Sequence, residues 1–186
     1  MYQTCGHFLE SFEHTTIDTT QPLVIQIESC KDHELLITEL EGRKLVQETV
    51  NEFAQSLKEK AYRSSDKTVE RLCYRLEIAL TRLEKKKPVF IPLYYPLDTM
   101  LFARIPESFG VYLWRSQRLH LHFYYRKTDY ENLLSTLFFY ASVVTLFAKK
   151  LRLTPGIIRG QFQHFESGTR DNILRERIVA KYGFNE

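Results

Sequence analysis

The chain has 186 residues, of which 44% are hydrophobic and 26% charged, and its formal net charge is +3. These values predict one soluble globular domain over residues 1–186, and so small a charge makes nucleic acid an unlikely partner while suiting an anionic small ligand. Cys5, Cys30 and Cys73 show no metal-binding or redox spacing, which indicates a reducing, cytoplasmic setting.

The first half of the chain is predicted to hold one strand and two helices. Residues 1–20 show no clear period and are either a loose N-terminal arm or a first helix; they also lack the apolar run of a signal peptide. Residues 23–27 alternate as a half-buried strand does, whereas residues 45–57 and 69–83 place apolar side chains at helical spacing. Asp66 stands where the second of these helices needs its N-cap.

The second half mixes strands with a long apolar helix, which predicts the α+β class. In chain order it contains predicted strands at 89–94, 110–114, 119–125 and 162–165, predicted helices at 133–151 and 171–182, and a turn at Pro155–Gly156. The two middle strands are expected to form a hairpin. The apolar run at 133–147 is too short and too often interrupted by polar residues for a membrane span, so no membrane is expected.

The most informative segment is the predicted strand at 119–125 with the charged residues that follow it. Its apolar members Leu119, Leu121, Phe123 and Tyr125 alternate with His120, His122, Tyr124 and Arg126. An arginine fixed at the end of a strand can bind a phosphate through a fork of N–H donors. His120 and His122 share one strand face, as two metal ligands would, but no third ligand is evident and no metal site is predicted.

Several segments, taken in order, carry a family resemblance. They are GRKL (42–45) with NEF (51–53), VFIPLYYP (89–96), IPESFGVYLWRSQRLHLHFYYRKTD (105–129), LRLTPGI (151–157) and His164. Across residues 40–166 the chain resembles thymidylate synthase and its relative deoxycytidylate hydroxymethylase. The resemblance implies a mixed β-sheet that helices cover on one side and whose outer face pairs with a second copy of the chain. A homodimer is therefore expected, and the many apolar strand residues support it.

The same resemblance implies a role for individual residues. Arg126 falls on the family's phosphate-binding arginine, and Asp129 on the aspartate that helps to bind nucleotide and folate. His164 matches a histidine that contacts the nucleotide sugar, and Glu52 matches the catalytic glutamate. Lys87 stands where the family has paired arginines that reach across the dimer to the phosphate, so it is also expected to bind nucleotide.

The departures from the family decide the expected function. The family's cysteine nucleophile follows a proline near Pro106, but here Glu107 and Ser108 follow instead. A thiolate is far more available at neutral pH than an alkoxide, so neither residue is an obvious substitute. Glu166 also replaces the family's tyrosine two residues after the sugar-binding histidine. We therefore expect an inactive member of the family that binds a pyrimidine nucleotide or serves as a structural partner.

Three other interpretations stay open at this point. The chain could be an active methyl- or hydroxymethyltransferase for dUMP or dCMP, with Glu52 as base and a reduced folate as cofactor; otherwise no cofactor is expected. It could be an interaction module without a ligand. Arg159 and His164 also have the spacing of a helical ribonuclease motif, but Arg115 and His120 share that spacing and Gly160 disfavours a helix.

Overall fold

The computed structural model describes residues 1–11, 21–59, 67–92, 108–166 and 169–183, and these residues form an α+β fold. In chain order the elements are α1 (Cys5–Glu10), β1 (Leu23–Ile27), the 3-10 helix η1 (His33–Ile37), α2 (Arg43–Glu59), α3 (Lys67–Glu84), β2 (Val89–Pro92), β3 (Ser108–Arg115), β4 (Arg118–Thr128), α4 (Tyr130–Leu151), β5 (Thr154–Phe165) and α5 (Thr169–Tyr182). The α+β class predicted from the sequence is therefore confirmed.

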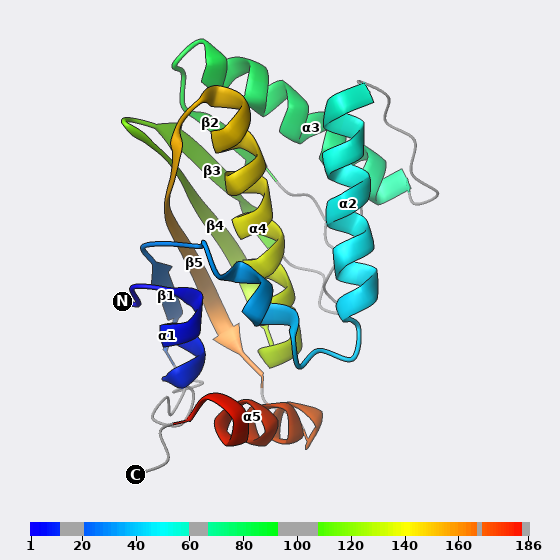
Figure 1. The fold of residues 1–186 in the computed structure, drawn as a ribbon, viewed down its shortest axis with the longest axis vertical. Coiled ribbons are helices and arrows are strands. Elements are labelled where there is room, and N and C mark those ends of the chain that lie inside the picture. Colours follow the sequence, from blue (N-terminus) through cyan, green and yellow to red (C-terminus); the bar gives the residue numbers. More distant parts are fainter. Residues whose placement is uncertain (12–20, 60–66, 93–107, 167–168, 184–186) are drawn as a thin grey trace.

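One mixed sheet organises the molecule (Figure 1). Its strand order is β1-β5-β4-β3-β2, and β4 pairs with β5 in parallel while the other neighbours are antiparallel. The predicted hairpin is present, because β3 and β4 pair from Arg115 and Leu119 at the turn to Ser108 and Tyr125 at the far end. Helix α4 connects the parallel strands β4 and β5, as such a crossover requires.

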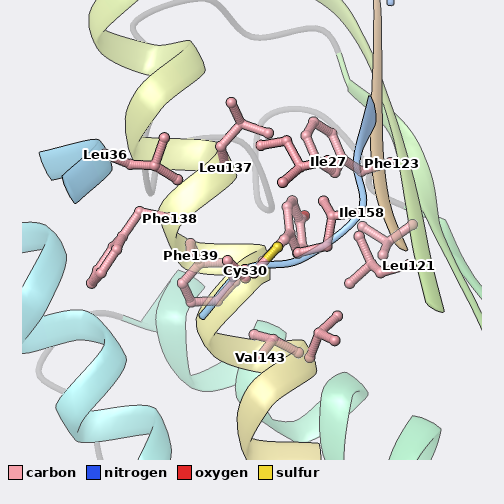
Figure 2. Close-up of a cluster of buried hydrophobic side chains, with 14 of the residues drawn as sticks. Ile27, Cys30, Leu36, Leu121, Phe123, Leu137, Phe138, Phe139, Val143 and Ile158 are labelled. Atoms are coloured by element: carbon pink, nitrogen blue, oxygen red, sulfur yellow. The ribbon is translucent and has the colours of Figure 1, made fainter. Parts of the chain in front are cut away.

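Helices cover one face of this sheet. Helix α4 packs on β4 and β5, and α3 packs on β2 and β3 (Figure 1). The strands turn their apolar side chains toward these helices, and this inner face is buried: Ile25, Ile27, Ile91, Val111, Leu113, Leu121, Phe123 and Ile158. The close-up in Figure 2 shows side chains of α4, including Leu137, Phe139 and Val143, gathered with strand residues around one centre.

Helix α4 is the central helix, as its apolar composition predicts. It is long and apolar enough to cross a membrane by length and composition, but 78% of its most apolar window is buried inside the structure. The side chains that bury it come from several elements, for example Phe53 of α2, whose ring centroid lies 6.0 Å from that of Phe147. Packing of this kind is sufficient to explain the apolar sequence of the helix.

The N-terminal residues are packed against the sheet edge rather than loose. Tyr2 bridges to Ile27 in parallel, and α1 follows at Cys5. The Asp32 carboxylate accepts hydrogen bonds from the backbone N–H groups of Cys5, at 3.1 Å, and Gly6, at 2.7 Å. The first-helix alternative is thus the one present over residues 5–10, while residues 12–20 lie outside the described part of the chain.

The turn predicted at Pro155–Gly156 is wrong, because both residues belong to β5. The strand begins at Thr154, and its register with β4 shifts between Leu119 and Leu121, which marks a bulge. Glycine is required there by close approach: a Cβ on Gly156 would lie 2.7 Å from the Nδ1 atom of His120. A Pro-Gly pair at the start of a strand and at a bulge gives the same sequence signal as a turn.

The remaining sequence predictions agree with the structure where it describes them. The predicted helices at 45–57, 69–83 and 171–182 correspond to α2, α3 and α5, each somewhat longer than predicted. The strand predicted at 162–165 is the end of the longer β5. The proposed N-cap Asp66 and the end of the strand predicted at 89–94 lie outside the described residues.

Candidate functional site

Three of the predicted ligand-binding residues lie at the ends of β4 and β5, a region that we call the anion corner: Arg126, Asp129 and His164. Side chains alternate along a strand and Lys127 is the residue paired with His164, so the side chains of Arg126 and His164 leave opposite faces of the sheet. Strands β4 and β5 are parallel and end together, so that the backbone of Lys127 pairs with that of His164. Beyond this pair, the Glu166 N–H donates to the Thr128 carbonyl at 2.8 Å. Arg126 and His164 are both exposed here, and α4 begins beside them with Asp129 as its N-cap.

Asp129 has a structural role that the sequence analysis did not assign. Its Oδ1 atom accepts from the Asn132 backbone N–H at 2.7 Å, and its Oδ2 atom accepts from the Asn132 side-chain amide at 2.7 Å. The carboxylate therefore satisfies the first turn of α4 as an N-cap. An aspartate directly before a long apolar helical run is the sequence signal that could have indicated this role.

Strand β3 also reaches the anion corner. Ser108, the first residue of β3, pairs through the backbone with Tyr125, the residue before Arg126. The backbone of Ser108 thus lies near that of Arg126, and Ser108 is one of the two residues that stand where the resemblance puts a cysteine nucleophile. The Tyr125 hydroxyl hydrogen-bonds that of Tyr140 on α4 at 3.1 Å in the buried core. This buried contact fixes the strand directly before the exposed arginine.

Lys87 lies at the opposite end of the sheet. It directly precedes β2, whose first residue Val89 pairs with Leu113, and Leu113 in turn pairs with Leu121. Arg126 lies toward the other end of β4. From the rise per residue of a strand, Lys87 and Arg126 are roughly 20 Å apart along the strand direction. Within one chain, Lys87 therefore does not join the anion corner.

Glu52 also lies away from the anion corner. It is exposed on α2, next to Phe53, whose ring packs at 6.3 Å from that of Phe139 in the middle of α4. The helix rise from Asp129 at the start of α4 to Phe139 is roughly 15 Å. The structure thus places the predicted catalytic glutamate on a different part of the helical layer from Arg126.

The described thiols lie elsewhere too. Cys5, at the start of α1, and Cys30, after β1, are both buried, and their thiols are hydrogen-bonded to each other. The pKa of the Cys5 thiol is raised strongly by its hydrogen bond with Cys30, by burial and by the nearby Asp32 carboxylate. Such a thiol is a poor nucleophile. The side chain of Cys73, on α3, is outside the described part of the structure.

Two cavities lie among the described residues. Acidic side chains dominate the charged lining of the first, which disfavours a phosphate, and the second has both acidic and basic side chains. The first, of about 230 Å³, lies between α5 and the start of α4 and is lined by Glu39, Glu41 and Glu131 together with Arg177. The second is an open groove of about 520 Å³ between η1 and α2, with both acidic and basic side chains. Neither is lined by Arg126 or His164, and both of these residues are exposed.

Five half-buried rings lie on the outer face of the sheet, opposite the face that α3 and α4 cover, and we call them the ring cluster: Tyr112, Trp114, His120, His122 and Tyr124. Trp114 stacks on His120 with centroids 5.0 Å apart, and His122 lies 4.3 Å from Tyr124. The His120 Nδ1 atom accepts from the Ile157 N–H at 3.1 Å, which satisfies the backbone at the bulge. Burial lowers the pKa of both imidazoles, with Arg118 adding to the effect at His120 and Arg159 at His122.

Two alternatives from the sequence can be judged from these positions. Among the described residues, no group of three or more His, Cys, Asp or Glu side chains could hold a metal ion. Arg159 and His164 lie on strand β5, whereas the ribonuclease motif needs a helix. The ribonuclease interpretation is therefore not supported.

No protein-family model matches the chain, and no curated protein matches it either. The resemblance to thymidylate synthase thus depends on the sequence segments quoted above and their order.

Proposed function

We propose that the chain is a divergent, homodimeric thymidylate-synthase-like protein that binds a pyrimidine nucleotide and lacks cysteine-dependent methyl transfer. The observation that supports this proposal is that Arg126, Asp129 and His164, predicted from separate motifs, all lie at the ends of two parallel strands. In this binding mode Arg126 contacts the phosphate, and the nucleotide extends past the strand ends so that His164 contacts the sugar.

The electrostatics of the corner favour an anion. Arg126 follows Tyr125, a residue whose backbone pairs with both β3 and β5, so the backbone that carries the guanidinium is held by the sheet. The start of α4 lies beside it, and the positive end of a helix dipole attracts negative charge. The Asp129 carboxylate offsets part of this attraction, which leaves Arg126 as the main phosphate contact.

Lys87 gives a reason for including a homodimer in the proposal. It lies at the far end of the same sheet from Arg126. In the family that the chain resembles, paired arginines at this position reach the phosphate of the other subunit. A second copy across the outer face of the sheet could supply Lys87 to the anion corner in the same way.

The test is calorimetry with dUMP and dCMP on the parent protein and on Arg126 variants. A charge-assisted contact contributes about 1.5–3 kcal/mol, so Arg126→Ala should weaken binding roughly ten- to a hundred-fold. Arg126→Lys should recover only part of the affinity, because the fork of donors is lost. Arg118→Ala, at the other end of β4, is the matched control and should bind as the parent does. Unchanged affinity in Arg126→Ala would rule out this site.

A second experiment addresses catalysis. Incubation with dUMP and a methylene-carrying reduced folate should give no thymidylate, because the described thiols are buried away from the anion corner. Turnover that disappears in Cys5→Ser, Cys30→Ser or Cys73→Ser would contradict the proposal and identify a nucleophile. Turnover that needs Glu52 but no cysteine would instead support the active-transferase interpretation.

A further inference from the structure

Positive charge is concentrated at one end of the molecule, which we call the basic end. It consists of three short segments, residues 82–87, 115–118 and 149–152, and Glu84 is the one carboxylate within them. Their cations are Arg82, Lys85, Lys86, Lys87, Arg115, Arg118, Lys149, Lys150 and Arg152. The whole chain has a net charge of only +3, so the remaining residues are negative on balance.

Contacts between the elements hold the three segments together. The Arg115 guanidinium donates to the Leu83 carbonyl at 3.0 Å, which ties the β3–β4 turn to the end of α3. Arg118 pairs through the backbone with Thr154, the first residue of β5, and this strand follows closely on the end of α4. Figure 1 shows the ends of α3 and α4 and the β3–β4 turn at the same end of the molecule.

The cations of the basic end face solvent from a backbone that is held in place. All of them are exposed except Arg115, which is half-buried. At the end of α3, the Lys87 N–H donates to the Arg82 carbonyl at 3.1 Å. At the end of α4, the Arg152 N–H donates to the Lys149 carbonyl at 3.3 Å. An anionic partner can therefore be bound without first ordering a flexible arm.

The helix dipole accounts for only part of this pattern. Cations are favoured in the last turn of any helix, so α3 and α4 themselves explain Arg82, Lys149 and Lys150. Arg115 and Arg118 lie on a turn between strands, where this effect is absent. A negatively charged partner would favour cations on all three segments at once.

We propose that the basic end is a docking surface for the phosphate backbone of double-stranded DNA, bound without regard to base sequence. The proposal goes beyond the nucleotide site and does not depend on it, because Arg118 and Arg126 lie toward opposite ends of β4. The small net charge of the whole chain, which makes nucleic acid an unlikely partner, does not reveal how unevenly that charge is distributed.

The dimensions of the basic end fit a short stretch of DNA backbone. The neighbouring strands β2, β3, β4 and β5 have cations at or next to their ends: Lys87, Arg115, Arg118 and Arg152. Adjacent strands are about 4.8 Å apart, so this row is roughly 14 Å long. Each strand of duplex DNA has one phosphate about every 3.4 Å along the helix axis, so the row spans roughly four phosphates.

The side chains of the basic end favour a duplex over other polyanions. A single strand needs rings on which its bases can stack, but Trp114 and His120, beside the basic end, stack on each other with centroids 5.0 Å apart. A membrane surface favours apolar side chains that insert among the cations. The apolar side chains of the three segments are those of Leu83, which is buried, and Leu151, which is half-buried. Cations alone are sufficient to bind the backbone of a duplex.

The experiment is fluorescence anisotropy with a labelled 20-base-pair DNA duplex across a series of NaCl concentrations. The parent should bind with a micromolar dissociation constant at 50 mM NaCl. Neutralising about four phosphates gives a slope of log affinity against log salt of roughly −3.6, so the affinity should fall roughly a hundredfold between 50 and 200 mM NaCl. No binding at 50 mM NaCl, or a slope near zero, would overturn the proposal. Tighter binding to the matching single strand, or binding to phosphatidylserine vesicles but not to the duplex, would overturn it as well.

A double variant tests whether the basic end is the surface that binds. Lys85→Gln combined with Arg118→Gln removes exposed cations from two of its segments. This variant should bind the duplex roughly ten- to a hundred-fold more weakly at 50 mM NaCl, with a salt slope smaller by roughly 2. Circular dichroism checks that it is folded.

The matched control is Arg43→Gln combined with Lys44→Gln. It removes the same charge from exposed positions at the start of α2 and should bind the duplex nearly as the parent does. Equal losses in the two double variants would show that only the net charge matters. Unchanged affinity in Lys85→Gln with Arg118→Gln would show that the duplex binds elsewhere, and either result would overturn the proposal.

Discussion

Two neighbouring rows of the sheet differ by one residue along each strand and have opposite characters. The inner row contains Ile25, Gly160, Phe123, Val111 and Ile91, and the outer row contains Gln26, Arg159, His122, Tyr112 and Phe90. Every side chain of the inner row is at most 4% exposed, whereas Phe90 in the outer row is 54% exposed. The inner row is thus covered by helices of the same chain, and the outer row by none in the described structure.

The difference shows that the two faces of one sheet can serve different purposes: the inner face contributes to folding stability, and the outer face is available for association. The inner row contributes more to stability, because its side chains are buried in the core with almost no solvent contact. The outer row can vary with less effect on folding, which leaves it available for association. This division is testable, since matched changes on the two faces of β4 should have different consequences for folding.

The largest effect is expected from Phe123→Ala. The Phe123 side chain is 0% exposed and stacks at 4.9 Å on Tyr140, so its truncation should lower the free energy of unfolding by about 3–5 kcal/mol. Tyr124→Ala, the next residue on the opposite face, should lower it by about 0.5–1.5 kcal/mol. Urea denaturation at low protein concentration keeps association from contributing. Equal losses in the two variants would contradict the division.

A medium effect is expected from Gly160→Ala. An added Cβ would lie 2.5 Å from the Cζ atom of Phe123, so a ring in the packed core would have to shift, at about 1–3 kcal/mol. The smaller side chain of Phe123→Leu should make room, and Gly160→Ala should therefore be less destabilising in that background. A double-mutant cycle measures this coupling, and additive losses would show that the ring and the glycine are independent.

A smaller effect is expected from His120→Gln. It removes the ring nitrogen that accepts the Ile157 N–H, a hydrogen bond that contributes about 0.5–1.5 kcal/mol. The pKa of His120 is lower in the folded chain than in the unfolded chain, so the unfolded state binds more protons in acid. The contribution is therefore full above about pH 6.5 and lost as the pH falls through the folded pKa. The parent and variant should differ in unfolding midpoint at pH 7.5 and converge toward pH 5; a constant difference would contradict this role.

Local patterns in the sequence predicted the sheet well. The alternation from Leu119 to Tyr125 identified both faces of β4, and the apolar composition of residues 133–151 identified the central helix. These predictions succeeded because burial on one face leaves a period of two in a strand and covers nearly all of a central helix. The position of Arg126 and His164 at the same end of the sheet was expected only from the family resemblance, since the two residues lie far apart in sequence. Their roles as ligand contacts stay predictions.

Other features depend on contacts that a sequence does not display. Pro155–Gly156 was misassigned because the glycine is required by the ring of His120, a residue on another strand. The 3-10 helix η1 is too short to show a period. The separation of Lys87 and Glu52 from the anion corner follows from strand order and from the packing of α2 on α4. The pattern of residues within one segment does not predict where that segment lies relative to segments far away in the sequence.

The pairing of β1 with β5 has a consequence for synthesis on the ribosome. Ile25 pairs with Gly160, so its partner is made roughly 135 residues later, which at translation rates of about 5–20 residues per second is a delay of roughly 7–27 s. During this time the apolar side chains of β1 have no strand to pair with. Strand β1 can therefore take its place in the sheet only when nearly all of the described protein has been made.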